Sequence, residues 1–174
     1  MTHRIRTAAL LVAVSAFAVQ AHAQAPKPAP ASEGIFATAK DTSAPANPAT
    51  EFMTKNGKEA GVTTTASGLE YKVLQSGPAG GASPKLGDEV QVVYEGRLLD
   101  GKVFDSSTDE NPAALQVGEL VPGWNEALQM MKPGDEWQLF IPPNLGYGDE
   151  AKGPIPGGSV MVFKMKLLSV GPLS

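Results

Sequence analysis

The chain has 174 residues, no cysteine, two histidines and a formal net charge of −4. Without cysteine it can form no disulfide, no thiol nucleophile and no thiolate metal site. An acidic chain is also a poor candidate for binding the phosphate backbone of nucleic acids.

Residues 1–23 have the pattern of a secretory signal peptide. Arg4 and Arg6 precede an uncharged stretch over residues 7–19, and Ala21-His22-Ala23 has the small-x-small form of a cleavage site. The stretch is shorter than the roughly 20 residues that a membrane-spanning helix needs. We therefore expect an exported protein, periplasmic or secreted, that has no membrane attachment after cleavage.

Cleavage after Ala23 would remove both histidines, His3 and His22. It would also remove Arg4 and Arg6, which leaves 12 basic against 18 acidic residues, or a net charge of −6. A Ser-His-Asp arrangement is then impossible within the chain. We expect no metal and no other cofactor.

Residues 24–50 are dominated by Ala, Pro, Ser and Thr, a composition that buries too little apolar surface to offset chain entropy. We predict an extended tether over residues 24–63. A short helix is expected within it over residues 51–60, stopping near Gly61. Because so short a helix is not stable alone, it packs on the domain or mediates a dimer, and the sequence leaves both open.

Residues 64–174 are predicted to form one domain made mostly of strands. Alternating apolar and polar residues predict strands over residues 69–75, 90–98, 115–117, 136–141 and 159–168. Asp100-Gly101 is a tight-turn signal, so Val103-Phe104 should return beside the 90–98 strand as a hairpin.

One convincing helix is predicted over residues 124–131. Its Trp124, Ala127, Leu128 and Met131 recur at helical spacing and form an apolar stripe. One short helix among about five strands, without βαβ spacing, predicts an α+β fold with an antiparallel sheet wrapped around that helix.

Tyr94, Phe104 and Asp105 are predicted to surround one concavity at an end of this sheet. Taken singly they have simpler explanations, since aromatic residues at strand spacing usually belong to the core and an Asp before two serines often forms a turn. Tyr147 differs, because it lies between two glycines in a Gly/Pro-rich loop over residues 142–158. An aromatic residue there has little packing reason to be present, which favours a binding role.

Five blocks occur in the order typical of one known family: Val92–Gly96, Leu99–Ser107, Val121–Trp124, Gly146–Gly148 and Ile155–Pro156. Over about residues 64–169 the chain therefore resembles the FKBP-type peptidyl-prolyl cis-trans isomerases. Residues 64–73 are similar to the leading segment of the secreted bacterial members.

The resemblance implies an apolar hollow that holds the ring of a substrate proline and binds macrolides of the FK506 and rapamycin type. The matching catalytic positions are Tyr94, Phe104, Asp105, Trp124 (the floor), Tyr147 and Phe163, and the substrate-binding positions are Leu120, Val121, Ile155 and Met161. It further implies that the Val121 N–H and the Tyr147 hydroxyl donate to substrate carbonyls. The implied reaction is rotation about X-Pro bonds of unfolded or proline-containing polypeptides, without covalent intermediate or metal.

The chain departs from the family pattern in three places. Many relatives carry an Arg that pairs with the Asp, whereas residues 108–112 offer Asp109 and Glu110 and no Arg. Ala113 stands where an aromatic residue is frequent, and Gly157-Gly158 replaces a proline-containing sequence and could loosen the rim of the loop. We therefore expect a working but slower isomerase, or one with an altered preference for the residue before proline.

Two other functions remain in view. A non-catalytic module could hold unfolded chains in the same hollow, and the altered residues 108–112 favour that reading. A hydrolase using Asp105 and Glu110 is disfavoured, because such enzymes need two acids with opposed pKa values on a polar cleft.

Overall fold

The computed structural model describes residues 47–171, which belong to a compact unit spanning Ser43–Ser174. The predicted signal peptide and residues 24–46 of the predicted tether lie outside the described residues. Between residues 47 and 171, no helix is long and apolar enough to cross a membrane.

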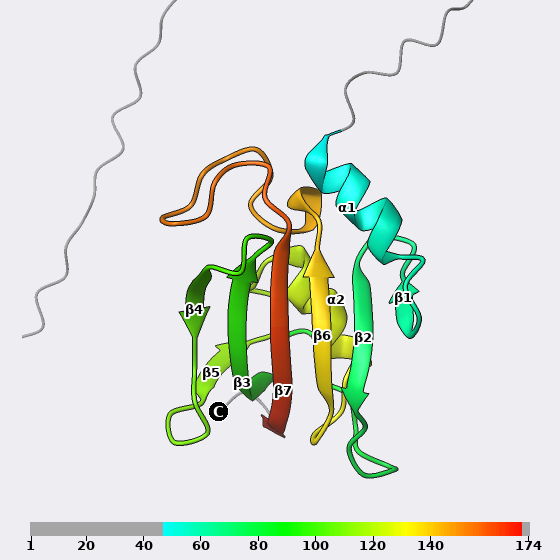
Figure 1. The fold of residues 1–174 in the computed structure, drawn as a ribbon. Coiled ribbons are helices and arrows are strands. Elements are labelled where there is room, and N and C mark those ends of the chain that lie inside the picture. Colours follow the sequence, from blue (N-terminus) through cyan, green and yellow to red (C-terminus); the bar gives the residue numbers. More distant parts are fainter. Residues whose placement is uncertain (1–46, 172–174) are drawn as a thin grey trace, which may run out of the picture. The chain divides into compact units, whose positions relative to one another are not determined.

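One antiparallel sheet forms the framework, with strand order β1-β2-β6-β7-β3-β4 and β5 paired with β3 (Figure 1). Its seven strands are β1 (Val62–Thr64), β2 (Glu70–Gln75), β3 (Glu89–Leu98), β4 (Val103–Ser106), β5 (Ala113–Gln116), β6 (Glu136–Ile141) and β7 (Met161–Gly171). The helices are α1 (Pro48–Asn56) and α2 (Pro122–Met130), with a 3-10 turn at Pro143–Leu145.

The predicted α+β class with an antiparallel sheet is confirmed, but the predicted counts of elements were low. The sheet has seven strands rather than about five, and two α-helices are present in residues 47–171 rather than one. β1 has only three residues, too few to show an alternating pattern. Its strand state comes from pairing with β2, in which Thr63 lies opposite Tyr71.

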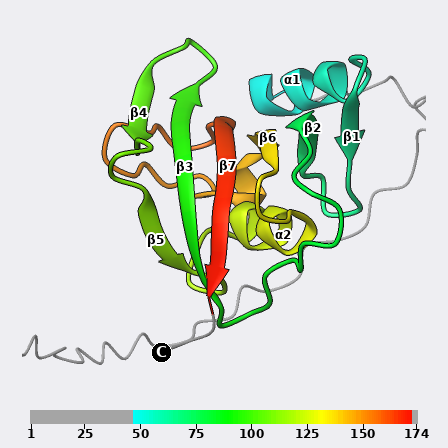
Figure 2. The ribbon, with the colours of Figure 1, turned by 90° about the horizontal axis from the view of Figure 1, so that it is seen from below.

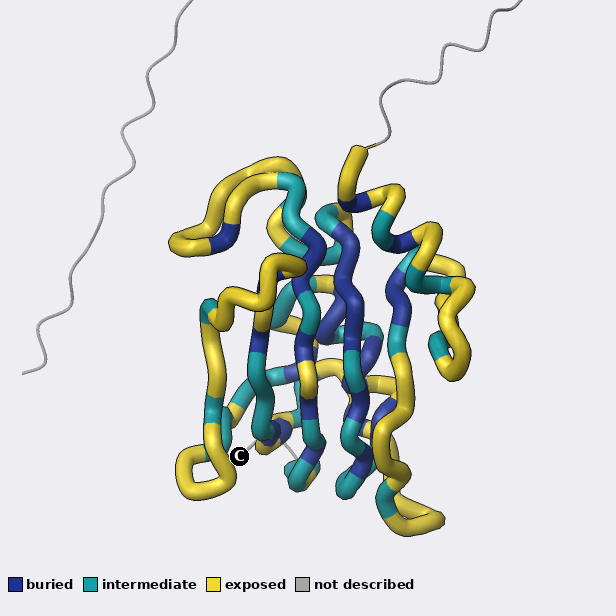
Figure 3. The backbone as a smooth tube through the Cα atoms, viewed as in Figure 1, coloured by how far each residue is buried: buried dark blue, intermediate teal, exposed yellow. Residues whose placement is uncertain are grey.

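The inner face of the sheet packs on α2. Alternate residues of β6 and β7 point to this face, including Leu139, Ile141 and Met165, and all three are fully buried. α2 contributes Ala127 and Leu128 to the same cluster. Figure 3 shows this burial concentrated in the central strands and the helix behind them. Removing these side chains from water is the main stabilising contribution to the fold.

α1 lies on the opposite face of the sheet from α2 (Figure 2). Ala49 and Met53 pack with Phe140 of β6 and with Val160, just before β7. Phe140 belongs to the outer parity of β6, which explains why this apolar residue interrupts an otherwise polar face. The sequence left open whether this helix packs on the domain, and the structure shows that it does.

The helix predicted over residues 51–60 is present with different bounds. It begins at Pro48, where Asn47 caps it by accepting a hydrogen bond from the Ala49 N–H at 3.0 Å. It ends at Asn56, and the Asn56 amide donates to the buried carboxylate of Glu70 on β2 at 2.7 Å. This bond ties the end of α1 to the sheet.

β3 organises the end of the sheet where the candidate site lies. It pairs with β7 on one side, and on the other side with β4 at one end and β5 at the opposite end. The register places Tyr94 beside Met165 and Gly96 beside Phe163. The predicted hairpin is thus confirmed, and its inner positions face the start of α2.

Candidate active site

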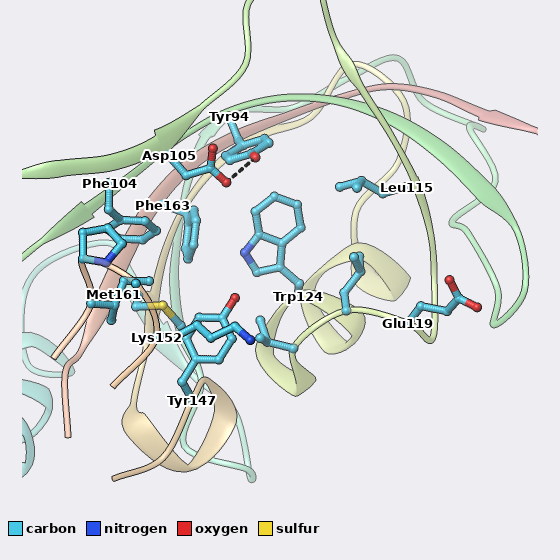
Figure 4. Close-up of a pocket in the computed structure, with 15 residues that line it drawn as sticks. Tyr94, Phe104, Asp105, Leu115, Glu119, Trp124, Tyr147, Lys152, Met161 and Phe163 are labelled. Atoms are coloured by element: carbon cyan, nitrogen blue, oxygen red, sulfur yellow. Dashed lines mark hydrogen bonds between the residues drawn. The ribbon is translucent and has the colours of Figure 1, made fainter. Parts of the chain in front are cut away.

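A cavity of about 550 Å³ lies between the β3–β4 hairpin, the start of α2 and the loop after β6 (Figure 4). The structure brings to this one cavity all the residues proposed from the sequence: Tyr94, Phe104, Asp105, Leu120, Val121, Trp124, Tyr147, Ile155, Met161 and Phe163. Sequence reasoning missed five further lining residues: Leu115, Glu119, Lys152, Gly153 and Pro154. Leu115 lay in a predicted strand, and the others follow block residues in the chain, but nothing in the sequence gave their direction.

Aromatic rings arranged edge to face form the floor and walls. Trp124 is buried at the start of α2, and its ring meets that of Tyr94 at 4.9 Å and 86° and that of Phe163 at 5.1 Å and 87°. Phe104 meets Phe163 at 5.5 Å and 88°. These are the favoured geometries for aromatic pairs, so the rings hold one another in place. The cavity therefore keeps its shape without help from a ligand.

Gly96 allows the aromatic walls to approach the sheet. A Cβ at this position would lie 2.6 Å from Cε1 of Phe163 and 2.7 Å from Cε2 of Phe104. Both rings occupy the space that any side chain at position 96 would need. The lack of a side chain at this inner position of β3 is thus a requirement of the site.

Asp105 is held by the hairpin itself. The Tyr94 hydroxyl donates to Asp105 Oδ2 at 2.7 Å, and the Ser106 N–H donates to Asp105 Oδ1 at 2.9 Å. Burial, followed by the hydrogen bond to Asp105 and its negative charge, raises the pKa of Tyr94 well above the ordinary tyrosine value. Tyr94 is therefore a neutral donor across the physiological pH range, in the position that the sequence comparison left for a missing Arg.

The acids of residues 108–112 do not line the cavity. Asp109 lies 3.8 Å from the Lys166 ammonium group. Its own backbone N–H and the Thr108 hydroxyl lower the pKa of the Glu110 carboxyl. The pairing of Asp105 with Glu110 that a hydrolase would need is absent from this part of the structure.

The N-terminus of α2 presents a backbone donor to the cavity. The Val121 carbonyl accepts the first hydrogen bonds of the helix, from the N–H groups of Trp124 at 3.0 Å and Asn125 at 3.2 Å. The Val121 N–H donates to no group within residues 47–171. It is thus free for an acceptor of a bound molecule.

Asn125 fixes the segment that leads to this donor. Its Oδ1 accepts from the Gly118 N–H at 2.8 Å, and its Nδ2 donates to the Leu120 carbonyl at 2.7 Å. One helical side chain therefore closes the turn between β5 and α2 and positions Leu120 and Val121.

The loop between β6 and β7 forms the remaining wall. Tyr147 is 40% exposed, and Figure 4 shows its hydroxyl directed toward the cavity. The two arms of the loop touch where a Cβ at Gly157 would collide with the Asp149 carbonyl. The Gly158 N–H also donates to the Gly148 carbonyl at 2.8 Å. The expectation that Gly157-Gly158 loosens the rim therefore needs correction, because these glycines let the arms pack together.

The arrangement suits an apolar ring flanked by two carbonyl acceptors. The cavity is lined mostly by aromatic and aliphatic groups, while the Val121 N–H and the Tyr147 hydroxyl lie at its edges. Burying an apolar ring there is favourable, and a few placed donors set its orientation.

Comparisons with known proteins agree with this geometry. A family model described as FKBP-type peptidyl-prolyl cis-trans isomerase matches residues 80–168. A second, described as the domain amino terminal to FKBP-type peptidyl-prolyl isomerase, matches residues 11–73. The first match contains the hairpin, α2 and the loop before β7.

Curated relatives match over the same region. The peptidyl-prolyl cis-trans isomerase Mip of Coxiella burnetii is 49% identical over 121 residues, which are 68% of this chain and 52% of the relative. The FKBP-type 22 kDa peptidyl-prolyl cis-trans isomerase of Escherichia coli is 43% identical over 122 residues, covering 69% of this chain and 58% of the relative. The chain spans about half the length of the curated relatives it matches.

Solved structures show the same fold. The crystal structure of FkpA from Escherichia coli is 41% identical with a TM-score of 0.68, over 72% of this chain and 59% of that one. A peptidyl-prolyl cis-trans isomerase from Pseudomonas syringae is 35% identical with a TM-score of 0.66, over 71% of this chain and 90% of that one. This chain belongs to the family of FKBP-type peptidyl-prolyl cis-trans isomerases.

Proposed function

We propose that the chain is a prolyl isomerase that accelerates rotation about X-Pro bonds in exported, proline-containing polypeptides. The observation that carries the proposal is the cavity over Trp124, which combines aromatic walls with the Val121 N–H and the Tyr147 hydroxyl at its edges. Family membership and the names of the relatives support the same activity.

The reaction is a problem of barrier height. Rotation about a peptide bond faces ~18–20 kcal/mol, because resonance is lost in the twisted state. The two isomers of an X-Pro bond differ by only about 1 kcal/mol, so a catalyst need only lower the barrier. This requires stronger binding of the twisted state than of the planar one.

The cavity has two features that favour the twisted amide. Its aromatic lining excludes water, which weakens solvation of the planar, charge-separated amide relative to the twisted and less polar one. The Val121 N–H and the Tyr147 hydroxyl then hold the carbonyls on either side of the proline ring in a turn-like geometry. Asp105 and Tyr94 act through their mutual hydrogen bond, which fixes the hairpin wall. No covalent intermediate is involved.

We propose export as the setting of this activity. The pattern of residues 1–23 supports it, and a relative named Outer membrane protein MIP, from Legionella longbeachae, is 42% identical over 121 residues. X-Pro isomerisation takes tens to hundreds of seconds without a catalyst, slow enough to limit the refolding of exported proteins.

The test is the isomerisation rate of short peptides with Leu or Phe before proline, measured with the full chain and with Tyr147→Phe and Asp105→Ala variants. We expect acceleration by the wild type, a loss of about fivefold to tenfold in the variants, and inhibition by macrolides of the FK506 type. Tenfold corresponds to about 1.4 kcal/mol, the size of one positioned hydrogen bond.

A folded chain that accelerates neither peptide would refute the isomerase. The non-catalytic binding module would then be the better description. Suppression of the aggregation of an unfolded client protein would test it.

A further inference from the structure

One cation lies among the residues that line the cavity. Lys152 is the only Lys or Arg in that lining, within the part of the chain that the structure describes. Figure 4 shows its amine directed inward, on the Tyr147 side of the cavity. None of the four ion pairs formed by residues 47–171 includes it. Its charge is therefore available to a bound molecule.

The backbone fixes where this charge can act. The Lys152 N–H donates to the Ile155 carbonyl at 2.8 Å, and the Ile155 N–H returns a bond to the Lys152 carbonyl at 3.0 Å. Ile155 is itself buried in the main core cluster. The two bonds and this anchor hold the base of the Lys152 side chain at the rim, while its flexible stem can follow a ligand.

The two carboxylates of the lining do not neutralise Lys152. Asp105 accepts hydrogen bonds from the Tyr94 hydroxyl and from the Ser106 N–H. In Figure 4, Asp105 and Lys152 lie on opposite sides of the Trp124 ring. The Glu119 carboxylate points away from that ring. The Tyr147 side of the cavity is therefore positive and the hairpin side negative.

We propose that Lys152 determines substrate specificity by favouring an Asp or Glu immediately before the proline. This inference rests on the proposed isomerase function. When the proline ring fills the cavity, the side chain of the preceding residue lies at the rim, within reach of the Lys152 ammonium group. An exposed ion pair of this kind changes the rate by about twofold to fivefold and is weakened by salt.

The test compares kcat/KM for two peptides that differ only in Glu or Gln before proline. In the wild type we expect a Glu to Gln ratio of about 2 to 5 at low ionic strength, falling toward 1 in high salt. The ratio should fall to about 1 in Lys152→Gln and below 1 in Lys152→Glu, and it should persist in Lys152→Arg. Lys85→Gln is the matched control, because Lys85 is exposed and does not line the cavity. Its ratio should equal that of the wild type.

Two results would overturn the proposal: a wild-type ratio of 1, or a ratio that survives in Lys152→Gln. A preference that appears only with the acid after proline would also overturn it. Failure of the isomerase function looks different, since then the Leu-Pro peptide would not be accelerated at all.

Discussion

The Tyr94 hydroxyl donates a hydrogen bond to Asp105 Oδ2 at 2.7 Å, and this bond joins β3 to β4 at the edge of the cavity. The carboxylate thus receives a neutral donor from the neighbouring strand. Burial and this partner raise the pKa of Tyr94, which keeps the phenol protonated in the folded state. The contribution of the bond to stability is therefore complete below the unfolded pKa of about 10 and is lost as pH rises through the folded value.

Tyr94→Phe should remove this alkaline loss of stability. We expect the wild type to lose more free energy of unfolding than the variant between pH 9 and 11, roughly the range above the ordinary tyrosine pKa. Urea unfolding at several pH values measures this. In a difference absorbance titration of the two proteins, the missing ionisation should lie above about pH 10. A missing step at or below that value would contradict the assignment.

Gly96→Ala should damage the site more than its size suggests. The new methyl group would displace the rings of Phe104 and Phe163, and overpacking of this kind costs about 1–3 kcal/mol. Macrolide affinity and isomerase activity should fall along with stability. Gly171→Ala is the matched control, because a Cβ there meets nothing closer than 3.9 Å and the residue also lies in a strand. Equal effects of the two changes would contradict the close packing at Gly96.

Asn125→Ala should loosen the turn that carries Leu120 and Val121. It removes two hydrogen bonds, to the Gly118 N–H and the Leu120 carbonyl, worth about 1–2 kcal/mol of stability together. Because the Val121 donor loses its fixed position, KM should rise by more than stability alone explains at temperatures where the protein stays folded. Gln129→Ala, also on α2, removes one exposed bond to the Asn125 carbonyl and should leave KM unchanged.

Asp135→Asn should change how stability depends on acid. Burial alone would raise the pKa of the Asp135 carboxyl. The Gly77 N–H at 2.6 Å and the Lys132 N–H and ammonium at 3.0 and 2.9 Å outweigh it, so the net pKa is lowered. Its contribution is present above the unfolded pKa of about 4 and is lost as pH falls through the folded value.

We therefore expect Asp135→Asn to cost about 2–3 kcal/mol at pH 7 and to reduce the loss of stability between about pH 5 and pH 2. Urea unfolding of both proteins across that range measures the difference. Asp149→Asn is the control, because Asp149 is exposed and its side chain has no hydrogen-bond partner among the described residues. Parallel acid profiles for wild type and Asp135→Asn would contradict the expectation.

Much of the fold followed from local patterns in the sequence. The strand over residues 136–141 matches β6 in full, and the helix predicted over residues 124–131 matches α2 to within two residues. Alternation and helical spacing record which side of an element is buried, so they survive without tertiary information. The bounds of α1 were less accurate, because Asn47 and Pro48 start the helix three residues before the predicted position.

The site divides in the same way. The sequence by itself determined the aromatic set around Trp124, because family blocks and strand parity both identify residues that turn inward. Only the tertiary structure decided that Tyr94 donates to Asp105, that Asp109 lies beside Lys166 instead, and that Lys152 points into the cavity. These relationships join segments far apart in the chain or depend on how a loop closes. Their geometry follows from packing and hydrogen bonds between elements, which no local pattern encodes.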